Sequence, residues 1–160
     1  LRARGVDLRA LRVVILGAGG AARGVGLALA REGAHVAVSA RRSDEAERVA
    51  RAVGGQRTTW PPARGSWDLL VNATPVGMAG DPALPLPAEV LGAGQVVVDL
   101  VYEPRETPLL AAARARGARV VPGLGMLVHQ AALQVERWSG QSAPVAVMRT
   151  AVQQALQPPP

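Results

Sequence analysis

The 160-residue sequence contains neither cysteine nor lysine, and the two absences exclude several kinds of site. Without cysteine there is no disulfide, thiolate nucleophile, iron–sulfur cluster or cysteine-ligated zinc. Without lysine there is no Schiff base, no lysine proton shuttle and no P-loop. The histidines, His35 and His129, are far apart in the sequence and have no carboxylate cluster beside them, so we predict no metal site. The chain is therefore poor in catalytic groups.

The sequence also lacks any apolar run long enough to span a bilayer. Its first ten residues carry three arginines and an aspartate, unlike the apolar segment of a signal peptide. With 49% hydrophobic and 19% charged residues, the composition is typical of a globular protein with one core. We expect a soluble, cytoplasmic protein with no membrane partner.

Basic residues outnumber acidic ones, and the formal net charge of +6 raises nucleic acid as a partner. Apart from residues 2–12 and the pair Arg41-Arg42, however, the arginines are spread singly along predicted helices. The aromatic residues are also too few for a base-stacking surface: Trp60, Trp67, Tyr102 and Trp138. We interpret the arginines as solvated helix faces and expect no nucleic-acid partner.

Short apolar runs rich in β-branched residues alternate with helical segments along most of the chain. Strands are predicted at 11–16, 35–39, 68–71, 95–100 and 118–121. Helices are predicted at 21–31, at 43–53 with Ser43 as N-cap, from Thr107 to a stop at Gly117, at 124–138 and at 144–156. This order predicts an α/β fold: a doubly wound, mostly parallel sheet of the Rossmann type with two C-terminal helices. Ligands of such sheets bind at the carboxyl ends of the strands.

A glycine-rich turn, Gly17-Ala18-Gly19-Gly20-Ala21-Ala22, directly follows the first predicted strand and opens a helix. It fits the pattern G-x-G-x-x-G/A, in which the first glycine makes the tight turn and the second lets the backbone approach a pyrophosphate. Ala22 and Gly26 would allow close packing between helix and strand. The order strand, turn, helix, strand favours dinucleotide binding over a purely structural glycine turn.

The end of the second strand indicates which dinucleotide. Enzymes that bind NAD place an Asp or Glu there for the ribose hydroxyls, whereas this chain has Ser39-Ala40-Arg41-Arg42 and no carboxylate before Asp44. Guanidinium groups can bind a 2′-phosphate through paired hydrogen bonds and can stack on adenine. The sequence therefore favours NADP, the ordinary alternative being two solvated arginines before a helix.

Four blocks of the sequence resemble the shikimate dehydrogenases, the NADP-dependent enzymes of the chorismate pathway of aromatic amino acid biosynthesis. The blocks extend over nearly the whole chain: GAGGAAR at 17–23, NATPVGM at 72–78, DLVYEP at 99–104 with TPLL at 107–110, and GLGMLVHQAA at 123–132. The first is shared with many dehydrogenases, and the other three in this order are specific to the family.

The resemblance implies a set of cofactor-binding residues. The pyrophosphate would lie on the glycine-rich turn, at Gly17, Ala18, Gly19, Gly20 and Ala21. The 2′-phosphate would lie beside the second strand, at Ala40, Arg41, Arg42 and Ser43. The adenosine half would lie near Asn72 and Thr74 after the third strand, and the nicotinamide near Leu100 and Gly123. Where the family commonly has Asn-Arg-Thr, this chain has Ala40-Arg41-Arg42, so an amide and a hydroxyl contact are lost and a second guanidinium takes their place. Arg41 aligns with the family's arginine. From the residues alone, Asn72 and Thr74 could equally satisfy loop backbone. Leu100 and Gly123 would be a core leucine and a turn glycine.

The resemblance further implies that Tyr102 contacts the carboxylate of shikimate and that Gln130 contacts a ring hydroxyl. A phenol and an amide can orient a polyol acid without changing its charge. From the residues alone, Tyr102 could be a half-buried aromatic, Gln130 a polar residue on an exposed helix face, and His129 a surface histidine.

The family's proton-transfer pair, a Lys and an Asp, belongs to an N-terminal substrate domain, and a chain without lysine cannot contain that Lys. We do not assign Asp99 to that role, because a carboxylate after an apolar strand most often caps backbone N–H groups. We expect residues 1–157 to be the NADP-binding domain, with the terminal helices completing the hinge region and the N-terminal substrate domain absent from this chain. We assign no catalytic residue here.

The resemblance implies an oxidoreductase that reversibly reduces 3-dehydroshikimate to shikimate with NADPH, of which this chain is the NADP-binding half. Alone it would bind NADP(H) and turn over nothing. The alternatives are a quinate/shikimate dehydrogenase that accepts NAD, a related tetrahydrofolate or glutamyl-tRNA reductase domain, and a non-catalytic dinucleotide-sensing module. The sequence leaves the oligomeric state open, a homodimer included.

Overall fold

The computed structural model describes Leu1 and residues 5–156, so the expected domain boundary at residue 157 lies just outside the described residues. The strands are β1 (Arg12–Leu16), β2 (His35–Ser39), β3 (Gln56–Arg57), β4 (Leu69–Asn72), β5 (Val96–Asp99) and β6 (Arg119–Val121). The helices are α1 (Gly20–Arg31), α2 (Ser43–Ala52), α3 (Pro108–Ala115), α4 (Leu124–Ser139) and α5 (Val145–Ala155), with a short 3-10 helix η2 (Ala88–Val90). Every strand and helix predicted from the sequence is present, and β3 and the short 3-10 helix η2 are additional.

The six strands form one sheet in the order β3-β2-β1-β4-β5-β6, and every neighbouring pair is parallel. The predicted doubly wound sheet is confirmed, and it is wholly rather than mostly parallel. The strand order reverses at β1, which pairs with β2 on one side and with β4 on the other. Leu16 at the end of β1 pairs with Ser39 and with Asn72, so the three strands end at one level. A ligand crevice opens at this edge in sheets of this kind.

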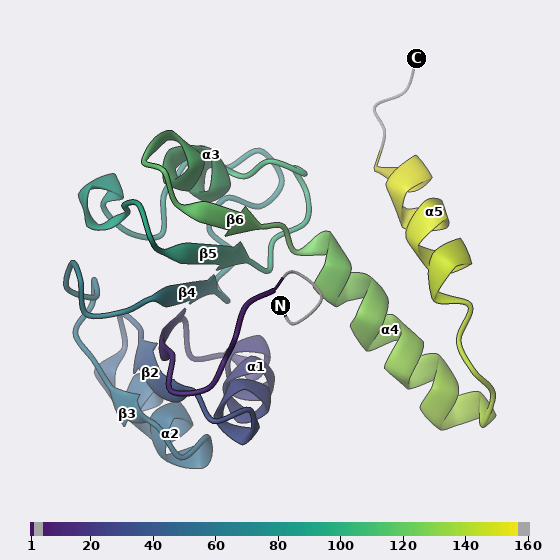
Figure 1. The fold of residues 1–160 in the computed structure, drawn as a ribbon, viewed down its shortest axis with the longest axis horizontal. Helices are drawn as coiled ribbons and strands as arrows, with labels where there is room; N and C mark the ends of the chain where they lie inside the picture. Colours follow the sequence, from purple (N-terminus) through teal and green to yellow (C-terminus); the bar gives the residue numbers. More distant parts are fainter. Residues whose placement is uncertain (2–4, 157–160) are drawn as a thin grey trace.

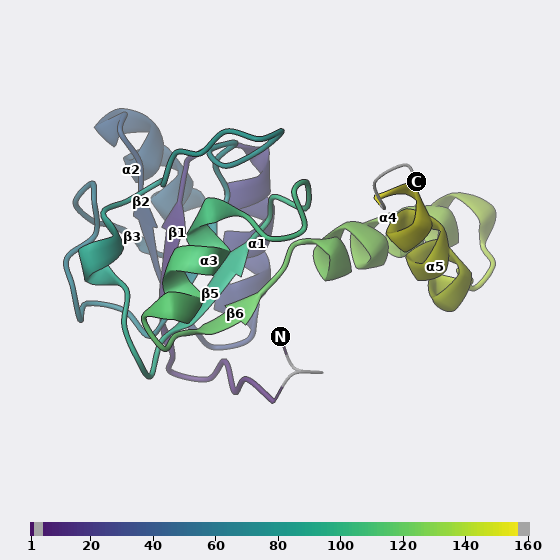
Figure 2. The same cartoon turned by 90° about the horizontal axis from the view of Figure 1, so that it is seen from above.

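Alternate residues of β1 pack against opposite layers of helices (Figures 1 and 2). Val13 and Ile15 belong to the hydrophobic cluster that includes α1 and α2, whereas Val14 and Leu16 belong to the cluster that includes α3. All four side chains are at most 2% exposed. A strand that is buried on both faces needs a continuous apolar run, and this is why residues 13–16 show no polar alternation.

The helix ends follow local sequence signals, with one correction. Thr107 caps α3 by accepting a hydrogen bond from the Leu110 N–H, and Pro108 follows it in the first turn as predicted. Ser43, in contrast, is not the N-cap of α2. The cap position belongs to Arg42, whose extended backbone carbonyl accepts from the Ala46 N–H, so Ser43 is the first helical residue.

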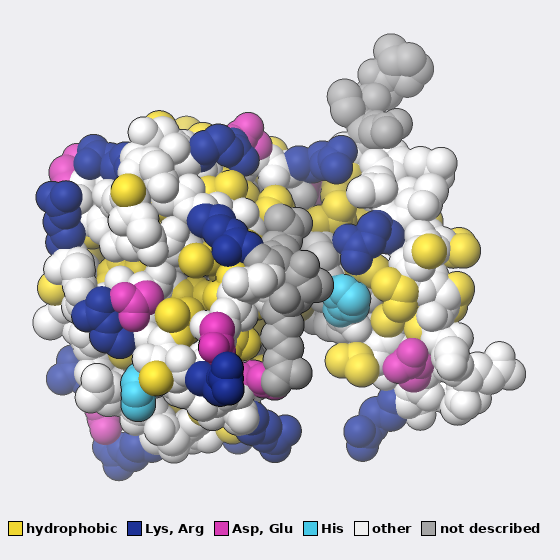
Figure 3. Space-filling model, in the orientation of Figure 1, with side chains coloured by type: hydrophobic (Ala, Val, Ile, Leu, Met, Phe, Trp, Pro, Cys, Tyr) yellow, Lys and Arg dark blue, Asp and Glu magenta, His cyan; other side chains and the backbone are white. Residues whose placement is uncertain are grey.

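The last two helices form a hairpin that projects from the sheet (Figures 1 and 2). Among the described elements, α4 packs only with α5, and Gly140 ends α4 in a left-handed conformation. Large apolar side chains stay exposed on the hairpin, with Leu133 and Val147 each 67% and Trp138 79% accessible. In Figure 3, hydrophobic atoms lie on this part of the surface, and the arginines of the same face are scattered. None of the described helices combines the length and apolar character needed to cross a membrane.

Candidate functional site

Two adjoining cavities open at the carboxyl edge of the sheet, above the reversal between β1 and β4. The first, which we call the arginine chamber, has a volume of about 650 Å³ and is lined by Gly17, Ala18, Gly19, Ala40, Arg41, Arg42, Glu45, Trp60, Ala73, Thr74 and Pro75. The second, the apolar chamber, has a volume of about 510 Å³ and is lined by Gly19, Gly20, Ala21, Ala73, Thr74, Pro75, Met78, Ala79, Leu100, Val101, Tyr102 and Glu103. Because the two share Gly19 and residues 73–75, they form one groove with two ends.

The glycine-rich turn lies between the two chambers and fits a pyrophosphate. Gly17 has a φ of +102°, and a Cβ there would lie 3.0 Å from the carbonyl oxygen of Ala73, so only glycine fits this tight turn. A Cβ on Gly19 or Gly20 would meet no atom within 4 Å, because both backbones face the open groove. Helix α1 begins at Gly20 without a side-chain cap, which leaves first-turn N–H groups for an anion.

Gly26 and Ala22 bring α1 close to its neighbours, as the sequence predicts. A Cβ on Gly26 would be 2.9 Å from Val53 Cγ1 and 3.3 Å from Ile15 Cδ1. Ala22 is completely buried. The small side chains therefore set the close approach of α1 to β1 and fix the position of the glycine-rich turn.

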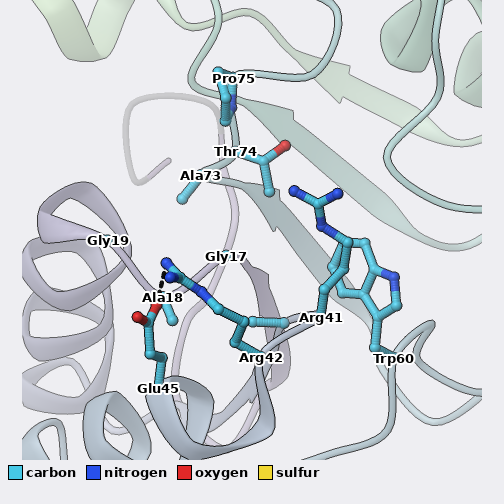
Figure 4. Close-up of a pocket in the computed structure, with 11 residues that line it drawn as sticks. Gly17, Ala18, Gly19, Arg41, Arg42, Glu45, Trp60, Ala73, Thr74 and Pro75 are labelled. Atoms are coloured by element: carbon cyan, nitrogen blue, oxygen red, sulfur yellow. Dashed lines mark ion pairs between the residues drawn. The ribbon is translucent and has the colours of Figure 1, made fainter.

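The two adjacent arginines of the arginine chamber differ in their partners (Figure 4). Arg42 pairs with Glu45 across the first turn of α2, with 2.7 Å between Nη2 and Oε2. Arg41 forms no ion pair with any described residue, and its side chain extends beside Trp60 towards Thr74 (Figure 4). The chamber therefore contains one uncompensated guanidinium. Ser43, also predicted to bind cofactor, is an exposed residue that lines neither chamber.

Trp60 was not predicted to take part in a site, although it lines the arginine chamber. It follows β3 in a loop that a hydrogen bond of 2.6 Å from Ser39 Oγ to the carbonyl oxygen of Thr59 ties to the end of β2. The indole is half-buried and stands beside Arg41 (Figure 4). No sequence signal pointed to it, because the edge strand β3 that precedes it was not predicted either.

Leu100 and Gly123 play different parts in the apolar chamber. Leu100 is half-buried and lines the chamber. Gly123 lines neither chamber but lies behind that wall, where a Cβ would be 2.6 Å from the carbonyl oxygen of Leu100. Position 123 therefore needs glycine for a close backbone approach.

Asn72 is completely buried and lines neither chamber. Its Oδ1 accepts hydrogen bonds from the N–H of Thr74, at 3.1 Å, and from Thr74 Oγ1, at 2.7 Å. Its Nδ2 donates to Asp99 Oδ1 at 2.9 Å. The amide thus fixes the loop that carries Thr74, and Thr74 itself lines both chambers.

Asp99 accepts hydrogen bonds from the N–H of Val101, at 3.0 Å, and from Thr107 Oγ1, at 2.6 Å, in addition to the bond from Asn72. The expectation that it caps backbone N–H groups is confirmed. Burial raises the pKa of this carboxyl group, and its three hydrogen bonds oppose the rise.

Tyr102 and Gln130, the two predicted substrate residues, do not share a cavity in the described part of the chain. Tyr102 is 39% exposed and lines the apolar chamber. Gln130 is exposed on α4 and lines none of the cavities described here, and neighbouring His129 is exposed as well. Among the described residues, no three carboxylate or imidazole side chains form a group that could hold a metal ion.

Comparison with known proteins identifies similar chains. The family model of the shikimate 5′-dehydrogenase C-terminal domain matches residues 123–153. The NADP(+)-dependent shikimate dehydrogenase of Gluconobacter oxydans is 47% identical over 135 residues, which cover 81% of this chain and 48% of that protein.

Solved structures show the same similarity. Shikimate 5-dehydrogenase of Thermus thermophilus, solved with NADP(H) and shikimate, has a TM-score of 0.89 and 40% identity over 98% of this chain and 59% of its own. The 5-ketofructose reductase of a Gluconobacter strain has a TM-score of 0.83 and 35% identity over 96% of this chain and 60% of its own. The chain therefore spans about half to three fifths of the length of these relatives.

Proposed function

This chain matches the C-terminal, cofactor-binding half of the NADP-dependent shikimate dehydrogenases, and on that premise we propose that it binds NADP(H) in the groove above β1 and β4. The observation that carries the proposal is the unpaired guanidinium of Arg41 at one end of the groove. A 2′-phosphate is a dianion, so an uncompensated cation beside the second strand favours NADP over NAD.

The proposed pose runs along the groove from the arginine chamber to the apolar chamber. The 2′-phosphate would contact Arg41, with Ala40 and Arg42 around it, and the adenine would stack on Trp60. The backbone of residues 17–21 would hold the pyrophosphate, and Thr74 would lie alongside. The nicotinamide would occupy the apolar chamber beside Leu100.

For the whole enzyme we propose the reversible reduction of 3-dehydroshikimate to shikimate. When bound, NADPH supplies a hydride to the ketone carbon, and the carbonyl oxygen takes a proton. The proton donor would be the lysine of the N-terminal substrate domain, because this chain contains none. Tyr102 and Gln130 would orient the substrate from this side once that domain is present.

The exposed apolar side chains of α4 and α5 also support the proposal that this chain is one domain of a longer enzyme. Leu133, Trp138 and Val147 would be covered by the N-terminal domain, with the hairpin as part of the hinge region. Residues 1–157 would then form the NADP-binding domain of a longer enzyme, as a monomer or a homodimer, and would be inactive alone.

Isothermal titration calorimetry of this chain with NADPH and NADH, at one fixed salt concentration, tests the proposal. We expect NADPH to bind clearly more tightly than NADH, and we expect no heat from shikimate alone. Equal affinities would contradict the NADP assignment and favour a quinate/shikimate dehydrogenase that accepts NAD. Binding of neither nucleotide would contradict the dinucleotide site itself.

A further inference from the structure

Asp99 is a buried carboxylate beneath the wall of the apolar chamber. Its side chain is 0% exposed, and one of its oxygens accepts from the N–H of Val101, a residue that lines the chamber. The other contacts of the carboxylate are with Asn72 and Thr107, both neutral. No cation among the described residues pairs with it.

The hydrogen-bond pattern matches the ionised form of this group. Asn72 Nδ2 and the Val101 N–H can only donate, and both point at Oδ1. Thr107 Oγ1 accepts from the Leu110 N–H and lies 2.6 Å from Asp99 Oδ2. If Oδ2 carried a proton, it would donate to Thr107 Oγ1, and the threonine hydroxyl hydrogen would have no acceptor among the described residues. The ionised carboxylate instead accepts from all three donors.

We propose that the Asp99 carboxylate makes the groove bind NADP+ more tightly relative to NADPH, and so lowers the reduction potential of the bound cofactor. The proposal rests on the proposed function, because it needs a nicotinamide in the apolar chamber. The ring carries one positive charge when oxidised and none when reduced, while the rest of the molecule is unchanged. The ratio of the two affinities therefore reports the field at the ring.

The surroundings make this charge effective. Met78, Leu100 and Val101 line the chamber with apolar atoms, which screen a charge poorly. Glu103 also lines the chamber, but its side chain is exposed and therefore surrounded by water. At an effective dielectric constant of about 20, a tenfold change in the affinity ratio requires a separation of about 12 Å between the unit charge and the ring.

The test is to measure the dissociation constants of NADP+ and NADPH for wild type and for Asp99→Asn. An amide of the same shape still accepts from Asn72 and Val101 at Oδ1, and its NH2 can donate to Thr107 Oγ1. The threonine hydrogen then loses its acceptor, and the Thr107→Ala control accounts for the loss of this hydrogen bond. We expect the ratio Kd(NADP+)/Kd(NADPH) to rise about tenfold, which corresponds to about +30 mV for the bound two-electron couple.

Two control variants separate charge from structural damage. Thr107→Ala removes one hydrogen bond to the carboxylate and the cap of α3 but keeps the charge, so the ratio should stay at the wild-type value. Glu103→Gln removes the same formal charge from an exposed position and should change the ratio less than threefold or so. A change in Glu103→Gln as large as that in Asp99→Asn would overturn the role of the buried group.

The outcomes also separate this inference from the function on which it rests. If wild type binds both forms and Asp99→Asn leaves the ratio unchanged, the field effect is wrong and NADP(H) binding stands. If wild type binds neither form, the proposed function itself fails. If Asp99→Asn weakens both forms equally, Asp99 only supports the fold.

Discussion

The backbone of Gly123 lies directly against the carbonyl group of Leu100, where a Cβ at position 123 would be 2.6 Å from the oxygen. The same Cβ would be 2.7 Å from the carbonyl oxygen of Asp99. Both neighbours are backbone atoms and cannot rotate away. The end of β5 and the start of α4 are therefore held in fixed register by the absence of a side chain.

Gly123→Ala should lower the free energy of unfolding by about 1–3 kcal/mol, because it overpacks a rigid contact. Gly125→Ala is the matched control, since a Cβ there meets nothing within 4 Å and alanine is the better helix former. Urea unfolding of both variants measures the difference. Equal stability of the two variants would show that the backbone can relax at position 123.

Gly17→Ala and Gly19→Ala should separate folding from binding. An alanine at position 17 is strained by the φ of +102° and by the Ala73 carbonyl, so it should cost about 1–3 kcal/mol of stability as well as affinity. An alanine at position 19 meets no atom, so its unfolding should match wild type while NADPH affinity falls at least about tenfold. If Gly19→Ala bound NADPH as tightly as wild type, the proposal that the pyrophosphate lies on this turn would be wrong.

Arg41→Ala should weaken NADPH binding by about 1.5–3 kcal/mol and NADH binding far less, because only NADPH has the 2′-phosphate. Arg42→Ala is the comparison, and it should lose less, since Arg42 already pairs with Glu45. Titration calorimetry at one salt concentration gives all four constants. Equal losses for the two nucleotides in Arg41→Ala would place the phosphate elsewhere.

Binding of NADP+, which does not absorb the light that tryptophan emits, should quench the fluorescence of Trp60, which lines the arginine chamber. The other two tryptophans lie outside it, Trp67 being 2% and Trp138 79% exposed. The quench should therefore disappear in Trp60→Phe and persist in Trp138→Phe. A quench that survives in Trp60→Phe would rule out adenine stacking on this residue.

The stability of wild type relative to Asp99→Asn should fall as pH rises. Burial raises the pKa of Asp99 in the folded state above its ordinary value of 3.8, so the folded protein holds this proton more tightly than the unfolded chain. The advantage is complete below pH 3.8 and is lost as pH rises through the raised pKa. Asp81→Asn should show the opposite trend, since backbone hydrogen bonds from Ala83 and Gly77 lower the pKa of Asp81. Urea unfolding of wild type and both variants at a series of pH values, from below 3.8 upwards, measures the direction of each change in the free energy of unfolding.

The sequence predicted the elements whose signals are local. Apolar runs, the Thr107-Pro108 start and the glycine stops placed the strands and helices, and the rule that ligands bind at the carboxyl ends of parallel strands placed the groove at the correct edge. It did not predict β3, because Gln56 and Arg57 are polar and exposed and become a strand only by pairing with β2 at the sheet edge.

The details of the groove depend on contacts between distant residues. Trp60 reaches the arginine chamber through the hydrogen bond between Ser39 and Thr59, which no local pattern announces. Asn72 follows the right strand, but its amide turns towards Asp99, 27 positions away in the chain. Arg42 is paired and Arg41 is not because Glu45 lies three residues after Arg42, on the first turn of α2.

Helix α4 leaves the sheet at the Pro122–Gly123 junction, so its direction is set there and any difference in direction would grow along its length. Its 16 residues extend about 24 Å, so a rotation of about 10° at this junction would displace the far tip by about 4 Å and Gln130 by about 2 Å. Small changes in the backbone contact between Gly123 and Leu100 are therefore magnified along the helix. The direction of Gln130, which is proposed to recognise a substrate hydroxyl, therefore depends on the backbone contact between Gly123 and Leu100.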